Sequence, residues 1–434
     1  MKRKHIIPLI LAAVAAAVLS PVRAVVGVSR GVVVDTADVD TAVIEADFVP
    51  ADSCDGADVI DTDSLPWPEN LTARIERIFE GTTIFNTSMV GMKIYDLTAD
   101  STLFEMNSRQ LLRPASTLKM IVAVAALDRL GADYTLKTAV GYRGKLDSLT
   151  LVGNVYCKGG FDPTLGNGDI SDIADSIAAL GIDTLRGDIC LDMTMKDRDR
   201  LGEGWCWDDD NPVLSPLVAA RKDDFGERLL KRLRQRGITV TGNCREDDMP
   251  GSVHYLYRKE TPLTSVMRRQ LKRSDNLYSE AVFYHIASDG AARSRATAKQ
   301  GRQAINRLVS KMGFRPSAYY IADGSGLSLY NYVSAELEVA FLRYAYRHGE
   351  IYGKLSECLP VAGIDGSLSD RMRRGAARGN VRAKTGTVTG ISSLAGYCTA
   401  SNGHLLCFSI INSGIRHTSS GRNFQDKVCQ AMCR

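Results

Sequence analysis

Three short motifs, spread over most of the chain, constrain its fold more than any other feature of the sequence. They are Ser-x-x-Lys at Ser116 and Lys119, Ser-x-Asn at Ser274 and Asn276, and Lys-Thr-Gly beginning at Lys384. Each motif alone is weak evidence for a site. A serine three residues before a lysine, for example, is usually just a pair on one helix turn. Their order and matched context indicate that the fold brings all three into one site.

The first motif offers a nucleophile and its base. A serine hydroxyl is a poor nucleophile at neutral pH, so another group must take its proton. The histidines of this sequence lie in no recognisable triad context. Residues i and i+3 share one face of a helix, so the Lys119 amine would lie beside the Ser116 hydroxyl. Burial of that amine near a second cation, Lys384, would lower its pKa from about 10.4 toward neutrality.

The second motif offers two short polar side chains. Ser274 can relay a proton to a leaving amine. The Asn276 amide can both hold Lys119 and bind a substrate carbonyl. Asp275 is expected to point elsewhere, because adjacent residues do not face the same side of the chain.

The third motif is predicted to begin a strand over residues 384–387, whose lysine and hydroxyls suit a free carboxylate. Gly386 leaves room for the backbone of a ligand. The backbone N–H groups of Ser116 and Thr387 are the natural pair for an oxyanion hole. The catalytic candidates are Ser116, Lys119, Ser274, Asn276 and Lys384, and the substrate-binding candidates are Thr385, Gly386 and Thr387.

The first residues are typical of a secretory signal peptide, assigned to residues 1–24. Cations at positions 2–4 precede an apolar run over residues 6–19, which is short for a bilayer-spanning helix. Cleavage after Ala24 would remove four cations and no acids, taking the formal charge from +4 to about zero. We therefore expect export to a periplasmic or other extracytoplasmic location, at most peripheral membrane contact, and no nucleic-acid partner.

Residues 25–64 form an acidic segment, with ten acidic residues against the single Arg30. A segment of this composition with little helical periodicity is expected to be a solvated, disordered linker. A pro-segment, or a strand docked on the basic remainder of the chain, is the alternative.

The pattern after residue 64 predicts an α/β (α+β) fold interrupted by an insertion. A hairpin over residues 88–106 and a buried helix over residues 115–130 precede a region rich in strands and glycine turns, and helical patterns resume beyond it. Because the three motifs span this interruption, residues 65–140 and 261–434 are assigned to one catalytic domain. Residues 141–260 are assigned to an inserted accessory domain.

Ten cysteines suit an exported protein better than one in a reducing cytosol. An Asn-Gly pair at 402–403 predicts a two-residue turn between strands 393–401 and 404–412, which places Cys398 directly opposite Cys407. A cross-strand disulfide and a pair of buried thiols both remain open there. The middle cysteines lack zinc-ligand spacing, and no metal or organic cofactor is expected.

With these motifs the chain resembles the D-alanyl-D-alanine carboxypeptidase/endopeptidase family of low-molecular-mass penicillin-binding proteins, peptidase family S13, of the penicillin-binding protein 4 kind. The likeness runs from Met89 to the C-terminus. It includes the stretches Gly159-Gly160-Phe161-Asp162-Pro163-Thr164-Leu165, Gly187-Asp188, Trp205-Cys206-Trp207-Asp208-Asp209, Asp323-Gly324-Ser325-Gly326-Leu327-Ser328, and Leu359-Pro360-Val361-Ala362-Gly363 with Asp365-Gly366. Of these, Asp162 and Trp207 are expected to be turn and packing residues.

The resemblance implies a penicillin-binding-protein/β-lactamase-like transpeptidase fold, with an antiparallel five-stranded sheet between helices and a smaller inserted α/β accessory domain. It implies a serine-type hydrolase of peptidoglycan stem peptides ending in D-Ala-D-Ala, or of the crosslink from D-Ala to a diamino acid. Both reactions would pass through a Ser116 acyl-enzyme, and β-lactam antibiotics would acylate the same serine. The insertion is shorter than in larger members of the family, so an accessory subdomain is expected to be reduced or missing.

Two other functions remain as alternatives. One is a β-lactamase, although no Glu-containing loop of that family's kind is recognisable between the first two motifs. The other is a non-catalytic cell-wall-binding or scaffold protein that kept the fold, although such a protein would have no need of Lys119.

Overall fold

The computed structural model of the chain describes residues 65–207, 211–288 and 295–434. The predicted signal peptide at residues 1–24 and the predicted acidic linker at residues 25–64 lie outside these ranges. No described helix combines the length and the apolar character that a bilayer crossing requires.

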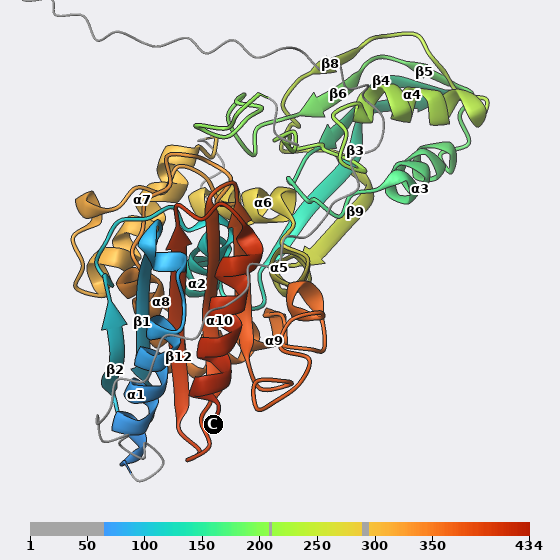
Figure 1. Cartoon of the computed structure of the whole chain (residues 1–434). Helices are drawn as coiled ribbons and strands as arrows, with labels where there is room; N and C mark the ends of the chain where they lie inside the picture. The colour runs from blue at the N-terminus through green and yellow to red at the C-terminus, as the bar shows by residue number, and fades with distance from the viewer. Residues whose placement is uncertain (1–64, 208–210, 289–294) are drawn as a thin grey trace, which may run out of the picture. The chain divides into compact units, whose positions relative to one another are not determined.

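A five-stranded antiparallel sheet organises the part of the chain that carries the three motifs (Figure 1). Its strand order is β10-β11-β12-β1-β2. The strands are β1 (Met89–Asp96), β2 (Ser101–Met106), β10 (Arg382–Val388), β11 (Ile391–Thr399) and β12 (Leu405–Ser413). β1 and β12 are neighbours although they are far apart in sequence, with Met92 opposite Ile410. The predicted first hairpin and the antiparallel five-stranded sheet are thereby confirmed.

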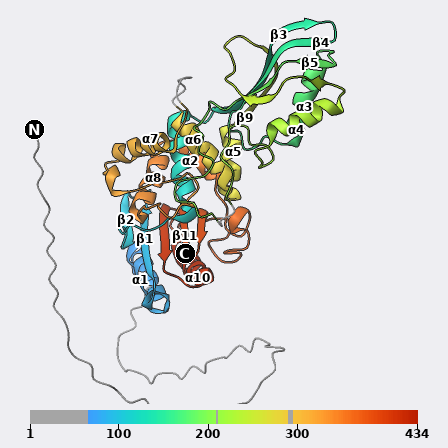
Figure 2. The same ribbon diagram turned by 90° about the horizontal axis from the view of Figure 1, so that it is seen from above.

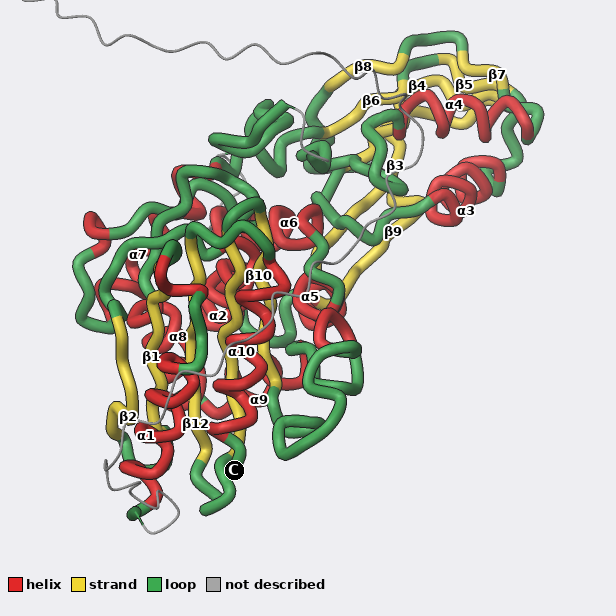
Figure 3. The backbone as a smooth tube through the Cα atoms, viewed as in Figure 1, coloured by secondary structure: helices red, strands yellow, loops and turns green. Residues whose placement is uncertain are grey.

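This sheet is buried on both faces, which explains the nearly continuous apolar runs of its central strands. Because successive side chains in a strand point to opposite faces, Leu394 and Ile410 enter one core, whereas Tyr397 and Ile411 enter the other. Helices α1 and α10 cover the first face, and helices α2 and α8 cover the second (Figure 3). Their bounds are α1 (Trp67–Glu80), α2 (Leu118–Leu130), α8 (Ala335–Arg347) and α10 (Thr418–Met432).

The hairpin between β11 and β12 differs from the prediction by one residue of register. The Ala400 N–H donates to the His404 carbonyl at 2.9 Å, so the loop has three residues, with Gly403 at a φ of +85°. The predicted two-residue loop was wrong, because a loop with one more residue shifts the whole pairing. Such a shift moves a side chain to the other face, so Cys398 and Cys407 lie in different cores. Both are free thiols, and the proposed disulfide between them is wrong.

A second, mixed sheet lies between the first and second motifs in sequence (Figure 2). β3 pairs antiparallel with β4 and β9, and β4 pairs parallel with β5 and β6. Helices α3 and α4 pack against it around a core of its own. The elements are β3 (Thr135–Asp147), β4 (Thr150–Lys158), α3 (Asn167–Ala178), β5 (Thr184–Arg186), β6 (Ile189–Asp192), α4 (Phe225–Gln235), β7 (Thr239–Val240), β8 (Cys244–Glu246) and β9 (His254–Pro262). β3 runs across the predicted domain boundary at residue 140, and the division into two domains remains a prediction.

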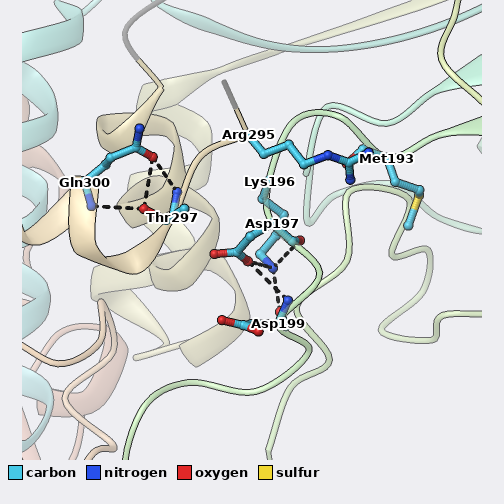
Figure 4. Close-up of polar contacts among 7 residues, drawn as sticks. All are labelled: Met193, Lys196, Asp197, Asp199, Arg295, Thr297 and Gln300. Atoms are coloured by element: carbon cyan, nitrogen blue, oxygen red, sulfur yellow. Dashed lines mark hydrogen bonds and ion pairs between the residues drawn. The ribbon is translucent and has the colours of Figure 1, made fainter. Parts of the chain in front are cut away.

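The remaining helices join α2 and α8 in one apolar core. They are α5 (Leu263–Lys272), α6 (Asn276–Ala287), α7 (Ala298–Lys311) and α9 (Gly349–Cys358). α7 begins with a capping box, in which the Thr297 hydroxyl accepts from the Gln300 N–H at 3.2 Å and the Gln300 side chain accepts from the Thr297 N–H at 2.9 Å (Figure 4). Both groups would otherwise lack partners at the helix start.

Two segments far apart in sequence lie side by side just before α7 (Figure 4). The Asp197 N–H donates to the Ala296 carbonyl at 2.9 Å. Lys196, the residue before Asp197, is fully buried. Its amine donates to the Asp197 carboxylate at 2.7 Å and to the Asp199 carbonyl at 2.5 Å. The same amine lies 4.7 Å from the ring centre of Tyr284 on α6. The segment that follows β6 is therefore attached to the helix that carries the second motif.

Candidate active site

Ser116 lies in a tight turn that leads into a buried helix. The turn is a 3-10 helix over Ala115–Thr117, and α2 begins directly after it. The sequence predicted a single helix with Ser116 in its first turn, so the helix starts later than expected. Ala115 has a left-handed backbone with a φ of +50°, which a non-glycine residue adopts only when its surroundings impose it. Gly326 packs against this turn so closely that a Cβ atom there would clash with the Ala115 carbonyl.

Lys119 lies one helical turn beyond Ser116 and connects the motifs. Its amine nitrogen is 2.8 Å from Ser116 Oγ and 2.8 Å from Asn276 Oδ1, and it donates to the Ser325 carbonyl at 2.6 Å. A neutral amine has two N–H donors and one lone pair. With its donors on Asn276 and Ser325, the lone pair faces the Ser116 hydroxyl, as a general base requires.

Burial sets the basicity of Lys119, which is fully enclosed. It lowers the pKa of the amine to about 8, while the carboxylates of Asp323, Glu280 and Asp275 raise it and so offset part of the effect. The lowered pKa and burial as its main cause agree with the prediction, whereas Lys384 is not among the groups that lower it. The repulsion between the two lysines acts on Lys384, whose own burial and the Lys119 charge hold its pKa well below the usual range.

The second motif has an unusual backbone conformation at its first residue. Ser274 has a φ of +56°, and its hydroxyl accepts from the Lys384 amine at 2.8 Å. Asp275 points away from the site, as predicted. Its carboxylate accepts from Arg221 at 2.9 Å and from Arg269 at 3.0 Å. These bonds fix the start of α6, from which Asn276 reaches the catalytic lysine.

The third motif lies on β10, an edge strand of the five-stranded sheet. Lys384 is fully buried and donates to the Thr385 carbonyl at 2.6 Å. Gly386 has no space for a side chain, because a Cβ atom would lie 2.8 Å from the Pro114 carbonyl oxygen and 2.9 Å from the Ser116 nitrogen. The prediction that Gly386 leaves room for a ligand backbone was incomplete. The missing side chain leaves room for the turn that carries Ser116.

The predicted substrate residues have mixed surroundings. Thr385 Oγ1 is 2.7 Å from Ser367 Oγ, and Thr387 Oγ1 accepts from Arg422 at 3.4 Å. The five predicted catalytic side chains form two hydrogen-bonded groups, one of Ser116, Lys119 and Asn276 and one of Lys384 and Ser274. The charge of Lys119 acts on Lys384 in the second group. Among the described residues, no group of three or more His, Cys, Asp or Glu side chains is placed to hold a metal ion.

Two groups at the site were not among the predicted site residues. One is the loop over residues 323–328, whose Ser325 carbonyl binds Lys119 and whose Gly326 covers the nucleophile turn. The other is Glu280, fully buried on α6 and hydrogen-bonded to this loop. The signals were present: residues 323–328 are one of the stretches that resemble the family, and Glu280 follows Asn276 by four positions on one helix face.

The two tryptophans of the middle region have different roles from those expected. Trp207, predicted to pack, is 92% exposed. Trp205 packs instead, and its indole N–H donates to Asp323 at 2.8 Å. Sequence alone cannot tell which of two tryptophans two positions apart faces inward. Asp162 is a turn residue as expected, because its buried carboxylate accepts from the Thr164 N–H at 2.9 Å.

The fold and the site, in which a serine hydroxyl lies beside a buried lysine amine, are typical of a class of serine hydrolases. Comparison with known proteins gives the family. Residues 71–222 and 213–433 match the model of the D-Ala-D-Ala carboxypeptidase 3 (S13) family, and the chain belongs to this family of serine peptidases.

Individual relatives agree with this assignment. The chain is 27% identical to a D-alanyl-D-alanine carboxypeptidase of Actinomadura sp. (strain R39) over 75% of this chain and 77% of the relative. Its fold is similar to the crystal structure of penicillin binding protein 4 (dacB) from Haemophilus influenzae, with a TM-score of 0.75, 21% identity, and coverage of 82% of this chain and 97% of that chain. The same Haemophilus protein complexed with a novel beta-lactam matches with a TM-score of 0.69 and 21% identity, over 82% of this chain and 98% of that chain.

Proposed function

We propose that the chain is a serine-type D-Ala-D-Ala carboxypeptidase and/or endopeptidase that acts on peptidoglycan stem peptides through a Ser116 acyl-enzyme. The observation that carries this proposal is the 2.8 Å contact between Lys119 Nζ and Ser116 Oγ, with a buried amine whose pKa is about 8. Membership of the S13 family and the names of the relatives support the substrate class. The same serine is proposed to react with β-lactam antibiotics.

Acylation starts with proton transfer from Ser116 Oγ to the Lys119 amine, while the oxygen attacks the carbonyl carbon of the penultimate D-Ala. The carbonyl oxygen becomes an oxyanion, for which the backbone N–H groups of Ser116 and Thr387 are the proposed donors. Lys119 is then an ammonium, and its hydrogen bonds to Asn276 and Ser325 remain satisfied, since both partners are acceptors.

Expulsion of the leaving group requires a proton on the departing amine nitrogen. We propose that the proton taken up by Lys119 is passed to this nitrogen through the hydroxyl of Ser274, which leaves Lys119 neutral again. The Lys384 amine contacts this hydroxyl at 2.8 Å. The C–N bond breaks, D-Ala leaves, and an ester to Ser116 remains. Lys384, Thr385 and Thr387 are the proposed groups for the terminal carboxylate of the substrate. Water then attacks the ester with Lys119 again as base, and Ser116 regains its proton.

Several assignments beyond the site belong to this proposal. The protein is proposed to be exported to the periplasm or another extracytoplasmic location, which the character of residues 1–24 supports. Residues 141–260 are proposed to form an inserted accessory domain, which the separate core beneath the second sheet supports. Partners are stem peptides and β-lactams, with no nucleic acid and at most peripheral membrane contact.

Covalent labelling tests the proposal. The mature protein and its Ser116→Ala variant are incubated with fluorescent penicillin, with Ser176→Ala as control, because the Ser176 hydroxyl lies on α3 and donates only to the Asp172 carbonyl of the same helix. We expect stable label on the parent and the control and none on Ser116→Ala, together with release of D-Ala from a pentapeptide by the first two only. Rapid turnover of the drug would instead indicate a β-lactamase. A parent that takes no label and releases no D-Ala would indicate a non-catalytic wall-binding protein.

A further inference from the structure

Glu280 is a buried acid next to the site that the proposed mechanism does not use. It lies on α6, one turn after Asn276, and only 1% of it is exposed. A buried carboxyl group is costly unless it is hydrogen-bonded or paired. Its presence beneath the general base therefore requires an explanation.

Glu280 holds the loop that binds the catalytic amine. Both of its carboxylate oxygens lie 3.1 Å from the Gly324 nitrogen, which donates to them. The preceding α6 residue, Ser279, donates to the Gly324 carbonyl at 2.6 Å, so α6 binds this residue from both sides. The next carbonyl along the chain, that of Ser325, accepts from Lys119 at 2.6 Å. The position of the lysine therefore depends on two successive residues that α6 keeps in place.

The loop has a second buried acid, which holds its own backbone. Asp323 accepts from the Gly326 N–H and the Ser328 N–H, each at 2.8 Å. Burial, with the Asp323 charge as the next cause, raises the pKa of Glu280 to about 8, while Lys119 lowers it. Glu280 therefore ionises over the same pH range in which Lys119 loses its proton, so its negative charge acts on the amine in that range.

The other charges around Lys119 are engaged elsewhere. Lys384, on β10, contacts Ser274, and Asp275, before α6, is paired with Arg221 and Arg269. Three carboxylates act on the lysine, those of Asp323, Glu280 and, least of the three, Asp275, which its two arginines hold. Asp323 is committed to the loop backbone, so Glu280 is the group whose charge can be removed with the least change of geometry.

We propose that Glu280 is a positioning residue for Lys119, because it fixes the segment over residues 324–325 and keeps a carboxylate close to the amine. This inference rests on the proposed function. Burial alone would lower the proton affinity of Lys119 further, and a very weak base accepts a proton poorly from serine. Glu280 therefore keeps the lysine both in place and sufficiently basic.

Two variants separate these roles. Glu280→Gln keeps an oxygen for the Gly324 N–H but removes the charge. Glu280→Asp keeps the charge but shortens the side chain, so it weakens the hold on the loop. The matched control is Glu338→Gln, which also changes a fully buried glutamate. Glu338 is hydrogen-bonded to Ser409 on β12 and to Thr117, but its charge is not among those that act on Lys119. For each protein, the rate constant of labelling by fluorescent penicillin is measured from pH 5.5 to 9.5, with the thermal unfolding midpoint as a measure of folding.

The expected results differ between the variants. Labelling of the parent rises with pH through about 8, because the neutral amine is the reactive form. Loss of a nearby negative charge makes the amine easier to deprotonate, so the midpoint for Glu280→Gln should move to lower pH, by roughly half a unit or more. Glu280→Asp should keep the parental midpoint and lose roughly tenfold in the plateau rate. Glu338→Gln should keep the parental midpoint.

Parental midpoints in both Glu280→Gln and Glu338→Gln would overturn the inference. If Glu280→Gln does not fold, Glu280→Asp decides: a parental plateau rate in a folded protein contradicts the positioning role, and a reduced rate at an unchanged unfolding midpoint supports it. Failure of the proposed function has a different signature, since the parent would then take no label at any pH.

Discussion

At the scale of single residues, the site depends on backbone conformations that few side chains tolerate. Ala115 and Ser274 both have positive φ angles, of +50° and +56°, next to or within the catalytic motifs. Such conformations cost roughly 1–3 kcal/mol each and persist only where packing enforces them. Gly326 and Gly386 allow that packing, because each brings its own backbone against the turn that carries Ser116.

The change Gly386→Ala should therefore act on the nucleophile rather than on substrate affinity alone. A methyl group at this position meets Pro114 and Ser116 backbone atoms at under 3 Å, so β10 and the turn must move apart. We expect penicillin labelling to slow by more than roughly tenfold, since small displacements at a reacting centre are costly. The measurement is the labelling rate constant.

Gly353→Ala is the matched control for this change. Gly353 lies inside α9, and a Cβ atom there would meet nothing within 4 Å. Alanine is the better helix former by about 1 kcal/mol, so this variant should be slightly more stable and fully active. Equal labelling rates for the two variants would contradict the steric argument.

The proposed catalytic residues could be predicted from the sequence, whereas the buried acids that hold the neighbouring loop could not. Ser116, Lys119 and Lys384 belong to short motifs whose spacing along a helix or strand implies their neighbours. Glu280 and Asp323 act through loop backbone that reaches the site only in the folded chain. Burial as the cause of the lowered Lys119 pKa was predicted, but the contribution of Lys384 was not confirmed, because the other charges that act on the amine, Asp323 and Glu280 among them, are brought to it only by the fold.

At the scale of elements, the interface between α8 and β12 contains an unusual acid. Glu338 on α8 is fully buried, and its carboxylate accepts from the Ser409 hydroxyl on β12 at 2.6 Å. Burial raises the pKa of this carboxyl to about 7. The packing of the helix on the sheet is therefore sensitive to pH.

The sign of this effect can be tested with Glu338→Gln. The folded pKa is about 7 against an ordinary value of 4.5, so the folded state binds more protons between these values. Stability contributed by this group is highest below about pH 4.5 and falls as the pH rises through 7. The difference in free energy of unfolding between the variant and the parent should therefore change by roughly 2 to 3 kcal/mol, in favour of the variant, from pH 5 to pH 8.

Urea unfolding of both proteins at the two pH values measures this difference. Glu350→Gln, at an exposed position in α9, should show no comparable gain. A constant difference between Glu338→Gln and the parent across the two pH values would mean that the carboxyl is already ionised at no cost in the folded state.

Element types were easier to predict from the sequence than strand register. The strands on both sides of the last hairpin lie within two residues of the predicted bounds, but the loop between them has three residues and not two. An Asn-Gly pair fits both lengths, with glycine at a positive φ in each. One residue of difference was enough to put Cys398 and Cys407 on opposite faces of the sheet.

At the scale of the whole molecule, a segment that follows a strand of the second sheet packs into the apolar core of the catalytic helices. Phe161, which follows β4, is fully buried in the cluster that contains α2 and α6, and its ring centre lies 5.8 Å from that of Tyr284. Its neighbour Gly160 provides the carbonyl that contacts the buried His285 ring at 2.9 Å. These contacts indicate that the two regions unfold together.

Phe161→Ala should weaken this coupling. Truncation of a buried phenylalanine costs about 3–5 kcal/mol, and here the loss falls where the two cores meet. We expect one calorimetric transition for the parent and two for the variant. Phe225→Ala removes a ring of the same size from the separate core beneath the second sheet and should lower the transition of that region. A single transition in Phe161→Ala would show that other contacts suffice to couple the regions.

The pairing of β1 with β12 also determines when, during synthesis, the serine becomes reactive. A ribosome releases the N-terminal part first, so Ser116 and Lys119 emerge long before the strands that complete their sheet. Until β10 to β12 have been translated, no Lys384 is available and β1 lacks its central partner. We therefore expect a product that ends before β10 to take no penicillin label, however much of the N-terminal half has been made.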